Sequence, residues 1–252
     1  MESVALSTAA FCLWGISPED KLGIARSLRF REIEIALSTE RMVRDFIRFL
    51  EAGASIPDFE RISVHAPWHR ARYGRNAPTE RILQGLRRIG DHLPVAEYVF
   101  HADCIEAPET LARWGRPVCV ENACGGHGDR MVTELLRRFE FTLALNMNRV
   151  ARENQDPQAL IREFGQRITR LPLSGHTGQL GRVPMKEAGQ LHLLEVLQGV
   201  KAPPVLEGLF QPGDTLAIKE ERWAVQRALF TGRRPQGALS WGPSAPWAEN
   251  VV

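Results

Sequence analysis

The chain has 252 residues, of which 44% are hydrophobic and 25% are charged. This length suits one large globular domain, and the composition is ordinary for such a domain. The formal net charge of +2 is too small to predict nucleic-acid binding by itself. No apolar run approaches the roughly 20 residues of a membrane span, and no signal peptide is recognisable. We therefore expect a cytoplasmic protein without a membrane partner.

Eight short β-rich segments follow one another along the chain. Several of them are almost continuously apolar before a polar end, which is typical of parallel strands buried on both faces. The predicted strands are Val4–Thr8, Glu32–Leu37, Arg61–Pro67, Tyr98–Asp103, Pro117–Asn122, Phe141–Met147, Ile168–Ser174 and Pro204–Leu209.

Helix-start signals lie between the predicted strands. Ser17, Asn76 and Asp156 each stand one or two positions before a proline, as a capping residue does before the first helical turn. Asp214 is expected to cap a last helix near Thr215–Phe230. Helices therefore alternate with strands along the chain.

This alternation predicts either a closed barrel or an open doubly wound sheet. The first strand is not followed by the G-x-G-x-x-G motif of dinucleotide-binding sheets, and the even spacing of the strands favours closure. We therefore predict a single (β/α)8 TIM barrel over residues 1–230. Residues 231–252 form a Gly- and Pro-rich tail with two tryptophans, which we expect to pack on the barrel or on a neighbour.

Histidines, glutamates and an asparagine stand at the ends of the predicted strands. In α/β barrels the carboxyl ends of all strands meet at one mouth, where the active site lies. Acidic groups gathered there need a cation or a proton between them, and histidine with glutamate suits zinc or manganese. The alternative for each residue alone is an ordinary hydrogen-bonded core position. The residues are Glu34, His65, His101, Glu121, Asn146, His176 and Glu207.

The same strand ends carry short motifs. They are Arg31–Ile35 (REIEI), Ile62–Trp68 (ISVHAPW), Val99–His101 (VFH), Val118–Asn122 (VCVEN) with the following Gly125–Gly128 (GGHG), and Val205–Glu207 (VLE). Together these motifs resemble the xylose isomerase-like TIM barrel superfamily, which includes sugar isomerases and epimerases and the endonuclease IV group. The resemblance covers roughly residues 1–230. It implies that Glu34 lies in a sugar pocket.

The chain departs from this superfamily at two strand ends. At the sixth strand the family commonly has an aspartate and, three residues later, a histidine, whereas this chain has Asn146 and Arg149. At the seventh strand the family commonly has a histidine and then an aspartate, whereas Pro172 and Gly175 stand here. The metal-ligand motifs are therefore eroded.

The ligands that the resemblance still implies would hold one divalent ion, zinc or manganese. His65, His101 and Glu121 match one metal position of the endonuclease-like pattern, with Glu207 or His176 nearby. Of the four ligands of the sugar-isomerase set, Glu121 and Glu207 are kept. A degenerate barrel without a metal is the alternative.

Arginines are frequent in the predicted mouth loops. Arg70 follows the third strand, and Arg182 lies in a glycine-containing loop over 174–182 that we expect to close over a substrate. Guanidinium groups suit phosphate and carboxylate, which predicts an anionic substrate. Trp68 could stack on a sugar or a base. The alternative is loop charge that only contacts solvent.

The leading hypothesis is a metal-dependent enzyme similar to sugar isomerases and epimerases, acting on a small anionic sugar-like substrate. Glu121 and Glu207 would be its catalytic residues, and Glu34, Trp68, Arg70, Asn146 and Arg182 would bind the substrate. A second hypothesis is an endonuclease IV-like phosphodiester hydrolase, for which nucleic acid would be the partner and which the near-neutral charge disfavours. A third is a non-catalytic ligand-binding barrel. The sequence predicts no oligomeric state.

Overall fold

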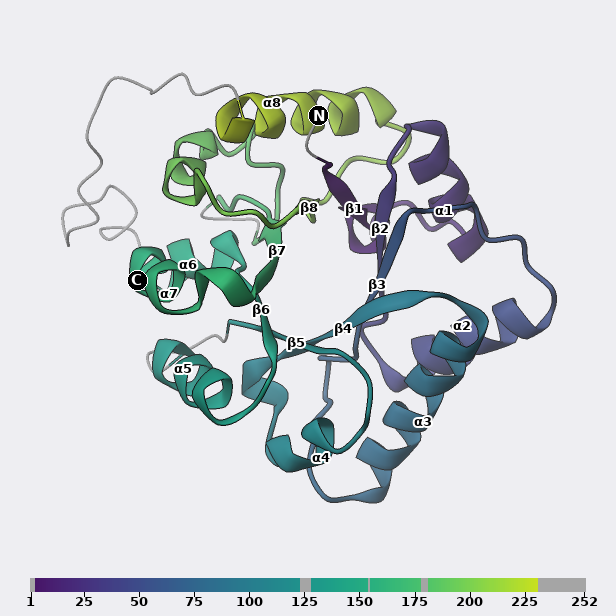
Figure 1. Cartoon of the computed structure of the whole chain (residues 1–252). Helices are drawn as coiled ribbons and strands as arrows, with labels where there is room; N and C mark the ends of the chain where they lie inside the picture. Colours follow the sequence, from purple (N-terminus) through teal and green to yellow (C-terminus); the bar gives the residue numbers. More distant parts are fainter. Residues whose placement is uncertain (1–2, 123–127, 154, 178–180, 231–252) are drawn as a thin grey trace.

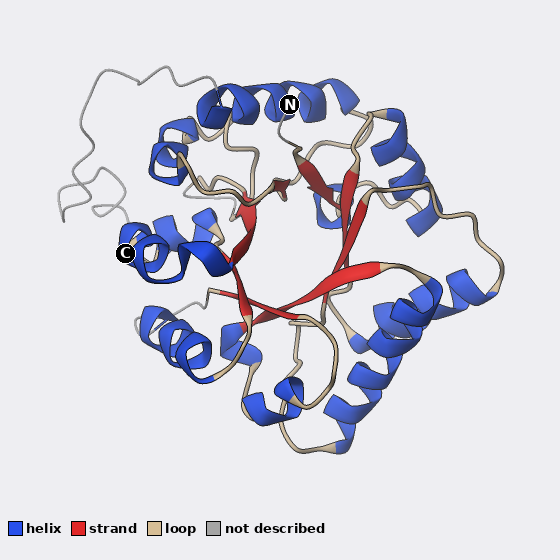
Figure 2. Cartoon of the chain, viewed as in Figure 1, coloured by secondary structure: helices blue, strands red, loops and turns tan. Residues whose placement is uncertain are grey.

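The computed structural model describes residues 3–122, 128–153, 155–177 and 181–230. Its eight strands form one closed barrel in the order β1 to β8, in which every neighbouring pair is parallel and β8 pairs with β1. Figures 1 and 2 show the strands as an inner ring with the helices outside it. The predicted (β/α)8 barrel is confirmed. The predicted tail 231–252 and loop residues 125–127 lie outside the described residues.

All eight predicted strands are present, with small differences at their ends. Val95 begins β4 three residues before the predicted start, and β6 ends at Ala144 because Asn146 caps a helix that begins at Met147. The strands are β1 Ala5–Ser7, β2 Glu32–Ala36, β3 Arg61–His65, β4 Val95–His101, β5 Val118–Glu121, β6 Thr142–Ala144, β7 Ile168–Leu173 and β8 Pro204–Leu206.

Helices connect these strands around the outside of the barrel. The segment between β7 and β8 contains a 3-10 helix, η4 (Leu191–Leu197), and three shorter ones are η1 Thr8–Phe11, η2 Ala102–Cys104 and η3 Gly165–Arg167. The α-helices are α1 Pro18–Ser27, α2 Glu40–Glu51, α3 Ala77–His92, α4 Pro108–Ala112, α5 Gly128–Arg138, α6 Met147–Arg152, α7 Pro157–Phe164 and α8 Thr215–Phe230.

The predicted helix starts are confirmed by their hydrogen bonds. Ser17 accepts from the backbone N–H of Asp20, whose carboxylate in turn accepts from Ser17, so the two form a capping box at α1. Asn76 and Asp156 accept from backbone N–H groups in the first turns of α3 and α7, and Asp214 does the same for α8. These caps fix the residue at which each of these helices begins.

The strand register sets which side chains reach the mouth. Val99, Cys119 and Ala144 are fully buried and pack together as a small cluster apart from the main core. Side chains two residues apart on a strand point to the same face. The residues two positions after this cluster are His101, Glu121 and Asn146, so the register carries all three toward the carboxyl ends of their strands.

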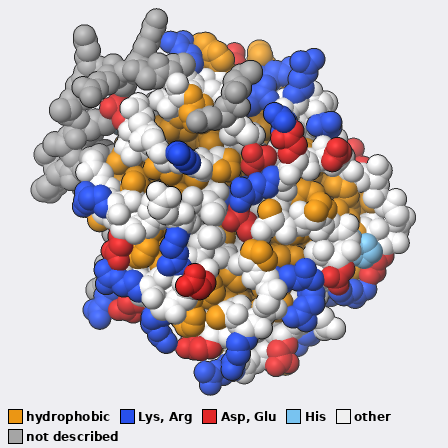
Figure 3. Space-filling model, in the orientation of Figure 1, with side chains coloured by type: hydrophobic (Ala, Val, Ile, Leu, Met, Phe, Trp, Pro, Cys, Tyr) orange, Lys and Arg blue, Asp and Glu red, His pale blue; other side chains and the backbone are white. Residues whose placement is uncertain are grey.

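Charged side chains of both signs are scattered over the face of the molecule that Figure 3 shows. Figure 3 shows lysine and arginine interspersed with aspartate and glutamate over the face in view, and no extended surface of one sign. Among the described residues, no helix has both the length and the apolar character needed to cross a bilayer.

Candidate active site

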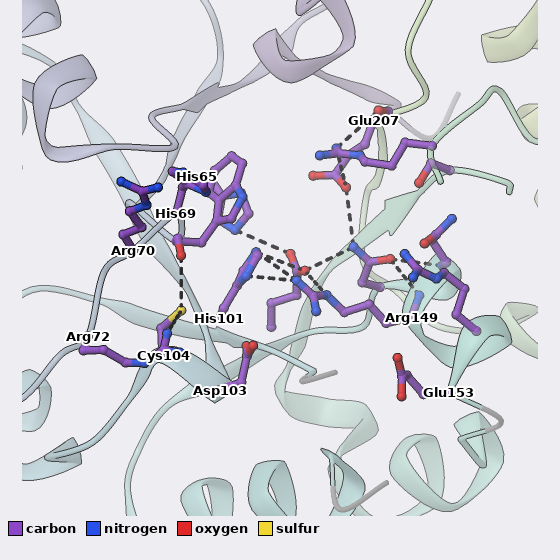
Figure 4. A pocket seen from close by; sticks show the side chains of 17 residues that line it. His65, His69, Arg70, Arg72, His101, Asp103, Cys104, Arg149, Glu153 and Glu207 are labelled. Carbon is purple, nitrogen blue, oxygen red and sulfur yellow. Dashed lines mark hydrogen bonds and ion pairs between the residues drawn. The ribbon is translucent and has the colours of Figure 1, made fainter. Parts of the chain in front are cut away.

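A cavity of about 520 Å³ lies at the carboxyl ends of the strands (Figure 4). It is the predicted mouth, because its walls come from the residues that end the strands and begin the following loops. The lining residues are His65, Trp68, His69, Arg70, Arg72, His101, Asp103, Cys104, Glu121, Asn146, Asn148, Arg149, Arg152, Glu153, Ser174, Arg182 and Glu207.

Glu121 is the most enclosed carboxylate of this cavity. It ends β5, its side chain is 2% exposed, and its Oε1 accepts a hydrogen bond of 2.8 Å from Nε of Arg149. The same guanidinium contacts the ring of His101, with Nη2 2.9 Å from Nδ1 and 3.2 Å from Nε2. Figure 4 shows Arg149 reaching from α6 toward His101. One arginine therefore contacts two of the predicted metal ligands.

Glu121 is an ionised carboxylate despite its burial. Burial by itself would raise the pKa of Glu121, but the interactions with His101, Arg149 and His65 lower the pKa to about 2. Burial also holds the pKa of His101 well below its ordinary value, so that this ring is neutral near pH 7. The fixed charge that keeps Glu121 ionised is therefore the Arg149 guanidinium.

Glu207, just after β8, has the opposite protonation preference. Burial is the main cause that raises the pKa of Glu207 to about 8, and the neighbouring carboxylates Glu34 and Glu121 add to it. Arg182 opposes this shift, with its Nη2 3.1 Å from Oε2 of Glu207. Glu207 therefore carries a proton more readily than Glu121 at neutral pH.

Asn146 joins the two glutamates. Its Nδ2 donates to Oε1 of Glu121 at 3.2 Å and to Oε2 of Glu207 at 3.4 Å. Its Oδ1 accepts from the backbone N–H groups of Asn148 and Arg149 at the start of α6. Because backbone N–H groups can only donate, these bonds fix which end of the amide is oxygen. The NH2 group therefore faces the carboxylates.

Aromatic rings cover one side of the site. The Trp68 ring stacks on His65 and on His101, with ring centroids 4.7 and 5.3 Å apart. Nε2 of His65 lies 3.6 Å from Oε2 of Glu121, and neither atom has a hydrogen-bond partner among the described residues. Oε1 of Glu34 is also buried without such a partner in that part of the chain. These atoms are free to bind a ligand.

Most of the predicted site residues are brought together. His65, Trp68, Arg70, His101, Glu121, Asn146, Arg182 and Glu207 all line the cavity. Glu34 is not a lining residue, but an oxygen of its carboxylate lies within 4.8 Å of ligand atoms of His65 and Glu207.

The structure does not bring His176 to this group. Its backbone N–H donates to Oε1 of Gln190 at 3.0 Å, and its carbonyl accepts from Nε2 of the same residue. His176 is partly exposed and does not line the cavity. The cause is local: Gly175 pairs with Val183 in an antiparallel bridge, which turns the chain away from the mouth just before His176.

The contact of Arg149 with Glu121 is the main feature that the sequence reasoning missed. From the sequence, Arg149 is named only as the residue that stands where the family commonly has a histidine, and it is assigned no partner. The available signal was its position three residues after Asn146, where the family commonly has a metal-binding histidine. A side chain at that position points at the same carboxylate.

By distance alone, two groups of side chains could hold a divalent ion. Ligand atoms of His65, His101 and Glu121 lie within 4.8 Å of one another, as do those of Glu34, His65 and Glu207. The donors around them do not fit the ion that the resemblance implies. Arg149 already bonds Glu121 and His101, and both Arg182 and Asn146 lie against Glu207. A second cation there would be repelled by the guanidinium charges.

Comparison with solved structures shows which barrels the fold of this chain is similar to. A D-tagatose 3-epimerase-like protein matches with a TM-score of 0.60 and 13% identity, over 90% of this chain and 99% of that chain. The probable 3-DHS dehydratase AsbF from Bacillus anthracis matches with a TM-score of 0.57 and 13% identity, over 89% and 98%. A sugar phosphate isomerase/epimerase from Parabacteroides distasonis matches with a TM-score of 0.52 and 14% identity, over 90% of this chain and 93% of that chain.

These similarities define the fold. The chain is a TIM barrel whose fold is similar to that of a D-tagatose 3-epimerase-like protein and of a sugar phosphate isomerase/epimerase, which agrees with the fold that the resemblance implied. No family model and no curated protein matches the chain.

Proposed function

We propose that this chain is an enzyme similar to sugar isomerases and epimerases, which moves a proton on the carbon beside the carbonyl of a small anionic sugar-like substrate. The observation that carries the proposal is the pair of buried glutamates, Glu121 and Glu207, at one cavity. A single amide bridges them, and each has a different arginine partner. Such a reaction needs one carboxylate that accepts a proton and one group that returns it.

The two glutamates suit these two roles. Glu121 is ionised, and its Oε2 has no hydrogen-bond partner among the described residues, so this oxygen can accept the proton from the carbon while the electron pair moves to the carbonyl oxygen. Glu207, whose pKa is about 8, holds a proton that it can return to the opposite face or to the adjacent carbon. Neighbouring carboxyl groups with separated pKa values are a frequent sign of such acid and base roles.

Arginines of the cavity suit the anionic part of the substrate. Five arginines line it against four acidic residues, so the mouth has an excess of positive side chains. Arg70 forms no ion pair with any described residue and is available for a phosphate or carboxylate. Guanidinium N–H groups of Arg149 and Arg182 could also stabilise negative charge on the carbonyl oxygen. The proposed reaction uses no divalent ion, because Oε1 of Glu121 already accepts from Arg149 and Oε2 of Glu207 already lies against Asn146 and Arg182.

The polyhydroxyl part of the substrate would meet unpartnered polar atoms. Oε1 of Glu34, Nε2 of His65 and Oγ of Ser174 are buried and have no hydrogen-bond partner in the described part of the chain. Buried polar atoms without partners are costly, and sugar hydroxyls can satisfy donors and acceptors alike. This supports a sugar-like ligand over an apolar one.

Hydrogen exchange at carbon tests the proposal even where the product is not identified. We would incubate the protein with a panel of ketose phosphates, aldose phosphates and keto sugar acids in D2O and follow the protons beside the carbonyl by NMR. The wild type should exchange one such proton in a panel member. E121Q and E207Q should each slow this exchange by about 10² to 10⁴-fold, the usual contribution of a positioned acid or base.

The matched control is E163Q, which makes the same change on the outside of α7. Glu163 pairs with Arg137 on the surface and lies outside the cavity, so its loss should leave exchange unchanged. Wild-type exchange in E121Q would contradict the role of that carboxylate. A panel member that stabilises the wild type against heat but exchanges no proton would instead favour a non-catalytic binding barrel. Asn146, which stands where the resemblance implies an aspartate, favours that second candidate.

A further inference from the structure

The space between Glu121 and Glu207 is where the isomerase resemblance implies a divalent ion. In this chain one oxygen of each glutamate already accepts hydrogen bonds or an ion pair from protein nitrogens, whereas Oε2 of Glu121 has no hydrogen-bond partner among the described residues. Oε1 of Glu121 accepts from Arg149 and Asn146, and Oε2 of Glu207 lies against Asn146 and Arg182. Two positive charges and one amide thus offset two carboxylates.

We propose that Arg149 and Asn146 stand in for the divalent ion, and that this barrel holds no zinc or manganese at its strand ends. The substitution changes both charge and bonding. A metal ion accepts electron pairs from carboxylates, whereas a guanidinium and an amide donate N–H groups to them. The resulting site has fixed donors and does not depend on an exchangeable cation.

Asn146 supports this inference because an aspartate could perform only half of its function. The oxygen of Asn146 caps α6, which an aspartate oxygen would do equally well. Its Nδ2 donates to both glutamates. The second oxygen of an aspartate in its place could not donate and would face the carboxylate oxygens of Glu121 and Glu207. Three carboxylates would then converge and would require a cation.

Arg149 supports it independently. Its side chain is 13% exposed, and it reaches Glu121 and His101 from the first turn of α6. A histidine at this position would offer a lone pair to an ion, whereas the guanidinium has only donors. Because a guanidinium can only donate, Nδ1 of His101, 2.9 Å from Nη2 of Arg149, is the acceptor of that contact.

The seventh strand gives a third reason. The family commonly has an aspartate where this chain has Gly175. A Cβ atom at Gly175 would lie 2.5 Å from Cβ of Ala188 and 3.3 Å from Cα of Met185. Any side chain at position 175 would clash with Met185 and Ala188, so the packing of this chain leaves no room for a metal-binding side chain there.

The single variant N146D tests the inference through stability, without an activity assay. This variant replaces the side-chain NH2 group of Asn146 with an oxygen and keeps the oxygen that caps α6. We expect N146D to melt at a lower temperature than the wild type in EDTA, because three carboxylates then face one another. Manganese or zinc should restore part of the loss in N146D, while the melting temperature of the wild type should be the same in EDTA and in either ion.

The double variant N146D/R149H tests it through metal content. It recreates the aspartate and histidine that the family commonly has at the sixth strand, and it should bind about one equivalent of manganese or zinc, measured by elemental analysis after dialysis. The control N146D/R162H places the histidine on the exposed surface of α7, outside the cavity, and should bind less. Circular dichroism would establish that each variant is folded.

Two results would overturn the inference. One is a wild-type protein that retains an equivalent of zinc or manganese after dialysis and loses it in E121Q, E207Q or E34Q. The other is a folded N146D/R149H protein that binds no more metal than the wild type. Neither result depends on a known substrate, so this inference and the proposed reaction can fail separately.

Discussion

Two glutamates in one cavity show how far neighbours decide the chemistry of a residue. Glu121 and Glu207 are both 3% exposed or less. Arg149 bonds Glu121 through Nε at 2.8 Å, whereas Arg182 approaches Glu207 at 3.1 Å and two carboxylates lie nearby. The same side-chain type is therefore ionised at one position and tends to be protonated at the other.

This difference predicts a pH dependence of stability. The pKa of Glu207 is raised to about 8, so the folded protein binds more protons than the unfolded chain between its ordinary value and about 8. The contribution of Glu207 to stability therefore falls as pH rises through that window. We expect E207Q to gain stability relative to the wild type between pH 5 and 8, measured by urea unfolding at each pH.

Glu121 provides the comparison of opposite sign. Its pKa is lowered to about 2, so the stability that its ionised form contributes is present above the ordinary value and is lost as pH falls toward 2. E121Q should therefore be destabilised relative to the wild type at pH 7, and the difference should shrink in acid. Equal pH profiles for the two variants would contradict this description of the site.

At the scale of the element, the barrel depends on how closely each helix approaches its strand. A Cβ atom at Gly90, in α3, would lie 2.2 Å from the hydroxyl of Tyr98 in β4. That hydroxyl is buried and donates to the carbonyl of Leu86 at 3.1 Å, so it cannot move without losing its partner. Gly90 therefore permits the contact between α3 and β4.

Two glycine substitutions test this packing. G90A should destabilise the protein by about 1–3 kcal/mol, the usual cost of overpacking. G23A is the matched control, because a Cβ atom there meets nothing within 4 Å and its helix α1 is otherwise regular. G23A should stabilise the protein by about 0.5–1 kcal/mol, since alanine favours a helix interior over glycine. Urea unfolding of both variants measures the two effects, and equal effects would contradict the packing argument.

At the scale of the whole molecule, a second buried ion cluster lies within the barrel. Arg170 of β7 is fully buried and donates to Glu97 of β4 at 2.7 Å, and Arg61 donates to the same carboxylate at 2.8 Å. E97Q should cost about 3–5 kcal/mol, because it leaves a buried guanidinium without its counter-charge. E134Q, which removes an exposed carboxylate on α5, should change stability by less than about 0.5 kcal/mol. Urea unfolding compares them, and similar losses would contradict the prediction.

The sequence predicted the barrel and most of the mouth because both depend on periodicity. Apolar runs with polar ends define parallel strands, and closure brings the strand ends together whatever the loops do. His65, His101 and Glu121 were placed correctly at the cavity for this reason.

The sequence could not predict contacts that depend on the path of a loop or on a rotamer. His176 was expected near the mouth, but the antiparallel pairing of Gly175 with Val183 turns it toward Gln190. The reach of Arg149 to Glu121 depends on where α6 begins, and the cap that sets this start is a side-chain hydrogen bond of Asn146. Neither has a periodic signal in the sequence.

The small apolar cluster of Val99, Cys119 and Ala144 has a consequence for how such a barrel can change over time. It contains no charge, and the residues two positions further along the same strands are His101, Glu121 and Asn146. Replacements among those later residues can alter the chemistry of the mouth while the cluster and the ion pairs of Glu97 keep their packing. Ligands at the mouth can therefore be exchanged one at a time without a change in the packing of this cluster.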